Sequence, residues 1–276
     1  MTPSSPSSAG GFRVVRYLAV LALSLLFLMP LLMAVNASFK APGEIQYALQ
    51  LPGSLYLENY ARAWNRIGPN MINSVLITVP AVILSVFVGC LAAYPLSHVN
   101  IPGGRFIYLV LLAGLLIPHQ AVQIPLFTIM RAIGLYNTIP GMWLVHTAYG
   151  IPFCTFFMRN FFSTVPRSMY EAAQIDGCGP SGYFFKILLP ASVSGLAALT
   201  VVQSRSVWND LFFGLTLTNG PGASPAPVAL YMLIGGMDVD EGQLMAATII
   251  SLLPIMIAFL LFQKAFTRGL LGGASK

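Results

Sequence analysis

The sequence predicts an all-α membrane protein with six transmembrane helices and both termini on the cytoplasmic side. First, 57% of the 276 residues are hydrophobic and only 8% are charged, whereas a soluble domain carries about 25% charged residues. Second, the charged residues are spaced so that six apolar segments approach or exceed the ~20 residues that cross a bilayer. Third, the Lys and Arg residues are distributed unequally between the two sets of loops that six such helices would create.

The first expected helix covers residues 17–39, between Arg16 and Lys40. A secretory signal peptide is the alternative, because Arg13 and Arg16 precede an apolar core and Val35-Asn36-Ala37 resembles a cleavage site. The apolar core of a signal peptide is only ~7–15 residues long, however, and this core is longer. We therefore expect an uncleaved transmembrane helix, preceded by a cytoplasmic tail of residues 1–16.

The other five helices are expected at similar charge-free segments. They are placed at residues 71–97, 106–130, 139–158, 187–208 and 242–263. Together the six helices define a membrane domain of residues 17–264, followed by a short cytoplasmic tail of residues 265–276. Several segments contain proline, which lipid tolerates where neighbouring helices or water satisfy the freed carbonyls. These prolines favour bent helices around a cavity: Pro30, Pro80, Pro95, Pro125 and Pro152.

The basic residues predict the orientation of the chain. With both termini inside, nine Lys and Arg lie on the cytoplasmic side and four lie outside, in agreement with the positive-inside rule. The net charge of +6 comes from scattered single residues and not from a basic run, so nucleic-acid binding is not expected. The segments at about 40–70 and 211–241 then face outward. The loop at about 159–186 faces the cytoplasm.

No pattern of catalytic or metal-binding residues is visible. The histidines His98, His119 and His146 are far apart and lack any ligand spacing. No phosphate-binding GxxxxGK[ST] loop is present, so the chain has no ATP site of that kind. The few carboxylates are not stacked along a helix as a proton relay would require. We therefore expect a non-enzymatic protein, without a cofactor or metal of its own, that receives free energy from another subunit.

The three cysteines do not predict a disulfide framework or a zinc site. Cys90, Cys154 and Cys178 are odd in number and widely separated, and no CxxC pair occurs. We interpret them as small buried hydrophobic residues.

The cytoplasmic loop of residues 159–190 predicts a short helix between two turns. Ser168 and Glu171 have the spacing of a capping box after Pro166. Asp176-Gly177 would end this helix, because glycine accepts the left-handed geometry of a helix C-terminus. Gly179-Pro180 would open the next one. The loop would thus hold a short helix rigidly against the end of the fifth transmembrane helix.

The string EAAQIDGCGPSGYFFKILLP, residues 171–190, resembles the EAA loop of ABC importer permeases. Glu171, Ala172, Ala173, Asp176, Gly177, Phe184, Leu189 and Pro190 all match that pattern. Cys178 stands where alanine is usual, and Ser194 where a second proline often follows. The likeness continues over nearly the whole chain, including Gly134-Leu135-Tyr136-Asn137-Thr138 and Trp208-Asn209-Asp210. It is nearest to the shorter membrane subunit of maltose-type, carbohydrate importers.

This resemblance implies a pore subunit of a sugar importer in the bacterial inner membrane. Its expected partners are a second, homologous permease, two ATPase subunits that use ATP and Mg²⁺, an extracytoplasmic solute-binding protein, the sugar and membrane lipid. The short helix would dock in the ATPase and transmit its closure to the transmembrane helices. The residues implied in this contact are Glu171, Ala172, Ala173, Asp176 and Gly177. Glu171 is the expected polar contact, although it could instead serve only in the capping box.

The substrate path is expected to involve polar residues of the transmembrane helices. Arg205 lies in or near the fifth helix, where a charge is costly and usually faces a cavity or a partner, although it could also extend toward the membrane surface. Trp208 could stack on a sugar or anchor the helix at the interface. The further candidates Asn73, Gln120, Gln123 and Asn209 could line the pore or bond to neighbouring helices.

Three other functions remain to be separated from the sugar importer. An ABC permease for a non-sugar solute would share the EAA loop. A secondary carrier would move its substrate without ATPase subunits. A membrane-embedded enzyme would need the clustered catalytic residues that this sequence lacks.

Overall fold

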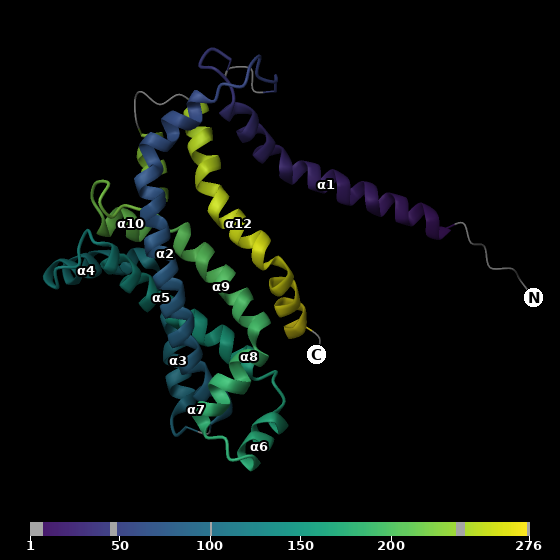
Figure 1. Ribbon diagram of the computed structural model, residues 1–276, viewed down its shortest axis with the longest axis vertical. Helices are drawn as coiled ribbons and strands as arrows, with labels where there is room; N and C mark the ends of the chain where they lie inside the picture. Colours follow the sequence, from purple (N-terminus) through teal and green to yellow (C-terminus); the bar gives the residue numbers. More distant parts are fainter. Residues whose placement is uncertain (1–7, 45–48, 100, 236–240, 275–276) are drawn as a thin grey trace, which may run out of the picture. The chain divides into compact units, whose positions relative to one another are not determined.

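The computed structural model describes residues 8–44, 49–99, 101–235 and 241–274, and within these ranges the chain is helical, without a β-strand (Figure 1). The all-α prediction is therefore confirmed. The chain divides into two compact units. Unit 1 comprises residues 1–66 and 233–250, and unit 2 comprises residues 67–232 and 251–276.

Unit 1 contains α1 (Ser8–Ser38), the first turns of α2 (Glu58–His98) and the first turns of α12 (Glu241–Ala274). The end of α1 is tied to the start of α2 by the buried amide of Asn59. Its Nδ2 atom donates to the carbonyl oxygens of Ser38 at 3.0 Å and Lys40 at 2.9 Å. The Ser38 hydroxyl lies 2.7 Å from the Tyr60 hydroxyl. These bonds satisfy carbonyls that the end of α1 would otherwise leave without partners.

The apolar side chains of α1 are largely exposed. Its most hydrophobic window has no buried residue, and Phe27 is 79% exposed. Such a surface is stable only against lipid or a partner. By length and composition, α1 is one of three described helices that could each cross a membrane, with α2 and α12.

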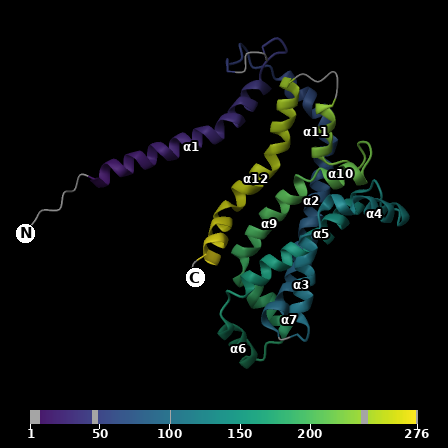
Figure 2. The same ribbon diagram turned by 180° about the vertical axis from the view of Figure 1, so that it is seen from behind.

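Unit 2 contains most of the remaining helices. They are α3 (Gly104–Leu115), α4 (His119–Ala132), α5 (Ile139–Phe162), α6 (Arg167–Ile175), α7 (Pro180–Tyr183), the π-helical turn η1 (Phe184–Leu188), α8 (Leu189–Ala191), α9 (Val193–Trp208), α10 (Phe212–Leu217) and α11 (Ala226–Ile234), whose last residues belong to unit 1. Within unit 2, α6 and α7 lie together at one end and α10 lies farther along (Figures 1 and 2).

Two of the expected transmembrane helices are broken in the structure. The segment expected at residues 106–130 consists of α3 and α4, which meet at an angle of 96°. Pro118 lies at this break with extended backbone dihedrals, and no proline can continue the hydrogen bonds of the preceding turn. The segment expected at 187–208 begins within η1 and bends by 77° at Ser192, between α8 and α9.

These breaks affect the number of segments that qualify as transmembrane. If each bent pair is one span, up to five described segments are long and apolar enough to cross a membrane. The fourth expected helix, at residues 139–158, corresponds to α5 but is not among those five.

The expected tails are partly helical. α1 begins at Ser8 and α12 continues to Ala274, so residues 8–16 and 265–274 belong to long helices. Residues 1–7 and 275–276 of the two tails lie outside the described residues.

The core of unit 2 depends on small residues where helices come close together. A Cβ atom on Gly89 of α2 would lie 2.4 Å from the Cβ atom of Cys154 of α5. Cys90 and Cys154 are buried in the same cluster as Phe162, which confirms the interpretation of these two cysteines as core residues. Close approach of backbones at small residues is a general means of packing helices in lipid.

Candidate functional site

Two regions of unit 2 hold the residues that the sequence singled out. The first is the coupling loop, residues 159–190, at the α6 end of the unit. The second is the Arg205 cavity, a hollow of about 320 Å³ lined by residues of α3, α4, α5, α9 and α10, with Asp210 from the connection before α10.

The coupling loop contains the predicted short helix, α6, but not the predicted capping box. Pro166 is the N-cap residue, and no side chain caps the helix. Ser168 is already the second helical residue. Glu171 instead lies 3.8 Å from the guanidinium of Arg167, one turn earlier, and both side chains are exposed. An exposed pair of this kind stabilises a helix by only ~0.3–0.5 kcal/mol. The carboxylate of Glu171 is therefore available at the surface.

The C-terminus of α6 is closed as predicted. Gly177 has a φ of 76°. The amide of Cys178 donates to the carbonyl of Ala173 at 2.8 Å, and the amide of Gly177 donates to that of Gln174 at 3.0 Å. These two bonds form a Schellman motif, which needs the left-handed residue that glycine supplies without strain. Gly179 and Pro180 then begin α7, also as predicted.

α6 is docked on the rest of unit 2 by one small and one aromatic side chain. Ala173 is 4% exposed and lies in the cluster that includes Tyr94, Tyr183 and Phe184. The ring of Tyr170 meets the ring of Tyr183 edge-on, and the ring of His98 lies near both. Of the expected coupling residues, Ala173 thus faces its own chain.

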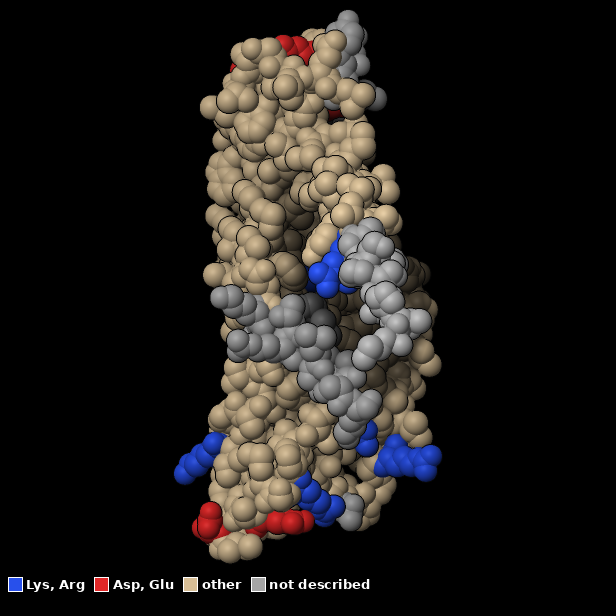
Figure 3. All heavy atoms as spheres, turned by 90° about the vertical axis from the view of Figure 1, so that its right-hand side faces the viewer, with Lys and Arg blue, Asp and Glu red and all other residues tan. Residues whose placement is uncertain are grey.

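The outward surface of α6 is formed by the other expected coupling residues. Glu171, Ala172, Asp176 and Gly177 are exposed. They are joined by Ile175, which is 87% exposed and which sequence reasoning missed. Its side chain adds an apolar group to the exposed side of α6. In Figure 3 the lower end of the visible face carries basic and acidic side chains, whereas most of the surface above it is uncharged.

The Arg205 cavity brings together charged and aromatic groups that are distant in sequence. Arg205 lines the cavity with Asp210, His146, His119 and Tyr149. The Oδ2 atom of Asp210 lies 3.9 Å from Nε2 of His146. The same oxygen accepts hydrogen bonds from the amides of Phe213 at 3.0 Å and Gly214 at 3.3 Å. Asp210 is thus held in place at the first turn of α10, with its carboxylate on the cavity wall.

Aromatic rings form another part of the wall of the Arg205 cavity. The ring of His119 stacks on Phe213 with centroids 5.0 Å apart, and it meets Tyr149 edge-on at the same distance. Flat apolar rings beside hydrogen-bonding groups suit a ligand that is polar at its edges and less polar on its faces. Among the described residues, no group of three or more His, Cys, Asp or Glu side chains could hold a metal ion.

The other expected substrate-path residues are not among those that line this cavity. Trp208 is buried, and its Nε1 atom donates to the carbonyl of Ser251 at 3.2 Å. Asn73 is buried as well and donates to the carbonyls of Pro221 and Ser224. Gln120 and Gln123 lie on α4, and Asn209 is exposed after α9. Sequence reasoning did not place His119, His146 and Tyr149 here, because only the fold brings α4 and α5 beside α9.

Comparison with known proteins places most of the chain in one family. The family model described as "Binding-protein-dependent transport system inner membrane component" matches residues 85–272. This range includes the whole coupling loop and every residue that lines the Arg205 cavity. The chain is similar to the diacetylchitobiose uptake system permease protein NgcG of Streptomyces coelicolor, with 34% identity over 95% of this chain and 88% of the relative.

Two further similarities agree with this family. The arabinooligosaccharides transport system permease protein AraQ of Halalkalibacterium halodurans is 30% identical over 96% of this chain and 94% of its own length. Among solved structures, a chain of a bacterial ABC transporter involved in the import of the acidic polysaccharide alginate has a TM-score of 0.81. It is 24% identical, and the match covers 96% of this chain and 100% of that one. At this identity the likeness shows the fold.

Proposed function

The chain belongs to the family of binding-protein-dependent transport system inner membrane components, and on this premise we propose that it forms half of the transmembrane pore of an ATP-driven sugar importer. The resemblance of the chain to the ABC importer permeases is thereby confirmed. Proteins of this family are membrane subunits and not enzymes, because ATP is hydrolysed by a separate subunit.

The observation that carries the proposal is the construction of the coupling loop. α6 is closed by the Schellman motif at Gly177 and docked through Ala173 and Tyr170. Its opposite surface, with Glu171 and Ile175, is exposed. A helix that is held firmly on one side and open on the other can transmit a displacement, since a flexible loop would absorb it.

The proposed mechanism is alternating access driven from the cytoplasmic side. Two ATPase subunits close around ATP and Mg²⁺ and carry the α6 helices of the two homologous permeases with them. Because α6 is joined to α7, η1 and α8, the displacement reaches α9, which lines the Arg205 cavity. When the ATPases close, the cavity would open toward the solute-binding protein outside the membrane. When they separate, it would open toward the cytoplasm.

The sugar is proposed as substrate for two reasons. The relatives described above are named for diacetylchitobiose and for arabinooligosaccharides. The Arg205 cavity combines hydrogen-bonding groups of both charges with the rings of Tyr149 and Phe213, and such a mixture suits the hydroxyl-rich edges and the apolar faces of a sugar. We assign contact with the substrate to Arg205 and Asp210, and we keep Asn73, Gln120, Gln123, Trp208 and Asn209 as residues that shape the path.

The membrane arrangement is part of the proposal. Six transmembrane segments with both termini in the cytoplasm would put the coupling loop where an ATPase can reach it, in the bacterial inner membrane. The excess of Lys and Arg on that side supports the orientation.

A reconstituted transporter tests the function directly. The chain is assembled with its second permease, ATPase and solute-binding protein in lipid vesicles, and ATP hydrolysis and uptake are measured with sugars, a peptide, a phosphonate and a polyamine. We expect both signals to rise with a sugar only. A response restricted to non-sugar solutes would overturn the sugar assignment. ATP-independent uptake by vesicles that contain this chain alone would identify a secondary carrier instead.

A further inference from the structure

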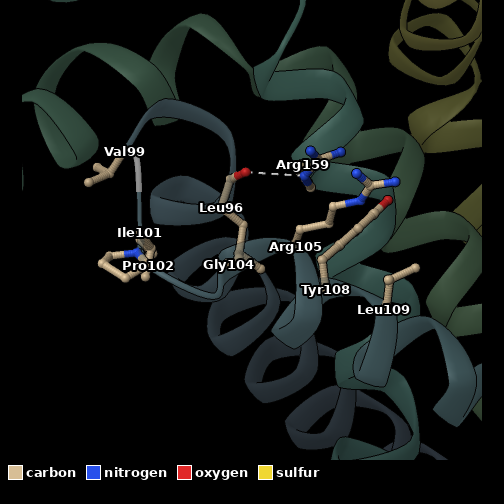
Figure 4. A pocket seen from close by; sticks show the side chains of 9 residues that line it. All are labelled: Leu96, Val99, Ile101, Pro102, Gly104, Arg105, Tyr108, Leu109 and Arg159. Carbon is tan, nitrogen blue, oxygen red and sulfur yellow. Dashed lines mark hydrogen bonds between the residues drawn. The ribbon is translucent and has the colours of Figure 1, made fainter.

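A second cavity of unit 2 lies where α2 ends and α3 begins, beside α5. It has a volume of about 720 Å³ and is distinct from the Arg205 cavity. We call it the Arg105 cavity. The nine residues that line it are Leu96, Val99, Ile101, Pro102, Gly104, Arg105, Tyr108, Leu109 and Arg159 (Figure 4).

Two arginines supply the polar part of the Arg105 cavity. Figure 4 shows the side chains of Arg105 and Arg159 extending toward each other beside Tyr108. No carboxylate lines the cavity, and no described carboxylate pairs with either guanidinium. Two neighbouring cations repel each other unless an anion lies between them. The chain by itself therefore supplies two positive charges to this cavity and no negative charge to balance them.

Arg159 is oriented before any ligand arrives. Its Nε atom donates to the carbonyl of Leu96 at 3.1 Å, and its guanidinium carbon lies 4.2 Å from the centre of the Tyr108 ring. The bond to Leu96 uses one of the five N–H donors and fixes the plane of the fork. The remaining donors suit the tetrahedral oxygens of a phosphate, which guanidinium groups bind in a bidentate manner.

The rest of the Arg105 cavity is apolar, and the helix beyond it is apolar too. Leu96, Val99, Ile101 and Leu109 form the walls. α3 has no buried residue, and most apolar side chains just after Arg105 are exposed, with Phe106 at 72% and Val110 at 54%. A ligand with a phosphate group and a hydrocarbon tail could place its phosphate at the two arginines and its tail on the apolar surface beside them, as a lipid does at the edge of a bilayer.

We propose that the Arg105 cavity binds a phosphate group through Arg105 and Arg159. The group is that of a membrane phospholipid or of a small soluble phosphate ester, and the apolar walls favour the lipid. A carboxylate of a neighbouring subunit is the competing occupant. It is disfavoured because a carboxylate would leave the apolar part of the cavity empty.

Native mass spectrometry of the purified assembled transporter tests this proposal. Short-chain phosphatidylglycerol, short-chain phosphatidylcholine and glycerol 3-phosphate are added in turn, and the bound fraction is measured for the native protein and for Arg105→Gln and Arg159→Gln. The control is Arg131→Gln, which removes the same charge from another arginine near an aromatic ring, Phe127. If Arg159→Gln fails to fold, Arg105→Gln still tests the proposal. Arg159 donates a hydrogen bond to the backbone at Leu96, whereas the side chain of Arg105 is exposed.

We expect phosphatidylglycerol to bind about tenfold more weakly to either cavity variant and normally to Arg131→Gln, because each guanidinium contributes charge-assisted hydrogen bonds. Binding of glycerol 3-phosphate with the same dependence on both arginines would support the phosphate site and assign it to a soluble ligand. Equal binding of phosphatidylglycerol to all four proteins would overturn the proposal. So would binding to the isolated chain but not to the assembled transporter, since a partner's side chain would then fill the cavity.

Discussion

The ring of Tyr170 in α6 meets the ring of Tyr183 in α7 edge-on, with the centroids 4.9 Å apart and the planes at 77°. This contact joins α6, whose other side is exposed, to the segment that leads into α9. Both rings also lie near His98 at the end of α2. A displacement of α6 therefore reaches two helices through one aromatic cluster.

Replacement of Tyr170 by Ala should uncouple ATP hydrolysis from transport. An edge-to-face pair contributes ~0.5–1.5 kcal/mol beyond the burial of its area, and its loss would loosen α6 without removing the exposed surface. We expect the ATPase to stay attached while uptake per ATP hydrolysed falls severalfold. The control is Tyr231→Ala, at an exposed position of α11. If Tyr170→Ala transports at the native ratio of uptake to hydrolysis, the aromatic contact is not part of the coupling route.

Gly177→Ala should weaken the end of α6 by backbone strain alone. The position has a φ of 76°, and a Cβ atom there would meet nothing within 4 Å. A left-handed non-glycine residue costs ~1–2 kcal/mol, so we expect reduced co-purification of the ATPase and reduced uptake. Gly179→Ala is a matched control two residues away, because a Cβ atom is equally free there and the φ is −69°. Equal effects of the two substitutions would show that the left-handed turn is not what matters.

Glu171→Ala should weaken attachment of the ATPase more than Arg167→Ala does. Both substitutions break the same exposed 3.8 Å pair, which contributes little to stability. Only Glu171→Ala removes the carboxylate that we assign to the partner contact. We expect several-fold weaker retention of the ATPase in a pull-down for Glu171→Ala and near-native retention for Arg167→Ala. The reverse order would move the contact to the arginine.

Arg205→Leu should alter transport and leave assembly intact. Hydrogen bonds to a charged group contribute ~1.5–3 kcal/mol, so the half-saturating substrate concentration should rise by about tenfold or more, as measured by uptake in reconstituted vesicles. Arg131→Leu is the matched control, since it removes the same charge from a residue that does not line the Arg205 cavity. Unchanged uptake kinetics in Arg205→Leu would favour a purely structural role for the arginine.

Gly89→Val should destabilise unit 2. Even a Cβ atom at this position would lie 2.4 Å from the Cβ atom of Cys154, and its neighbours are buried. Overpacking of a core costs ~1–3 kcal/mol, so the melting temperature of the purified protein in detergent should fall by several degrees. Gly222→Val, where nothing lies within 4 Å of a Cβ atom, should melt close to the native protein. A native melting temperature for Gly89→Val would mean that α2 and α5 can separate without loss.

Much of the chain could be read from local sequence because membrane helices obey local rules. The scarcity of charge predicted long apolar helices, and the start expected for the fourth, residue 139, coincides with the start of α5. Pro166, Gly177 and Pro180 predicted both turns of the coupling loop. The capping box failed because Pro166 took the cap position, which left Ser168 inside the helix and Glu171 beside Arg167.

The sequence by itself determined that this chain belongs in a membrane and that the loop of residues 159–190 contains a short helix with a closed C-terminus, because charge spacing and backbone dihedrals act over a few residues. Only the tertiary structure decided which side of that helix is free. It buried Ala173 and left Ile175 exposed. It also decided which polar residues share a cavity. Arg205 lines one cavity with Asp210, His146 and Tyr149, whereas Trp208 is buried and bonded to the backbone of Ser251. The angles between helices select those neighbours, and they arise from packing between segments that are far apart in the chain.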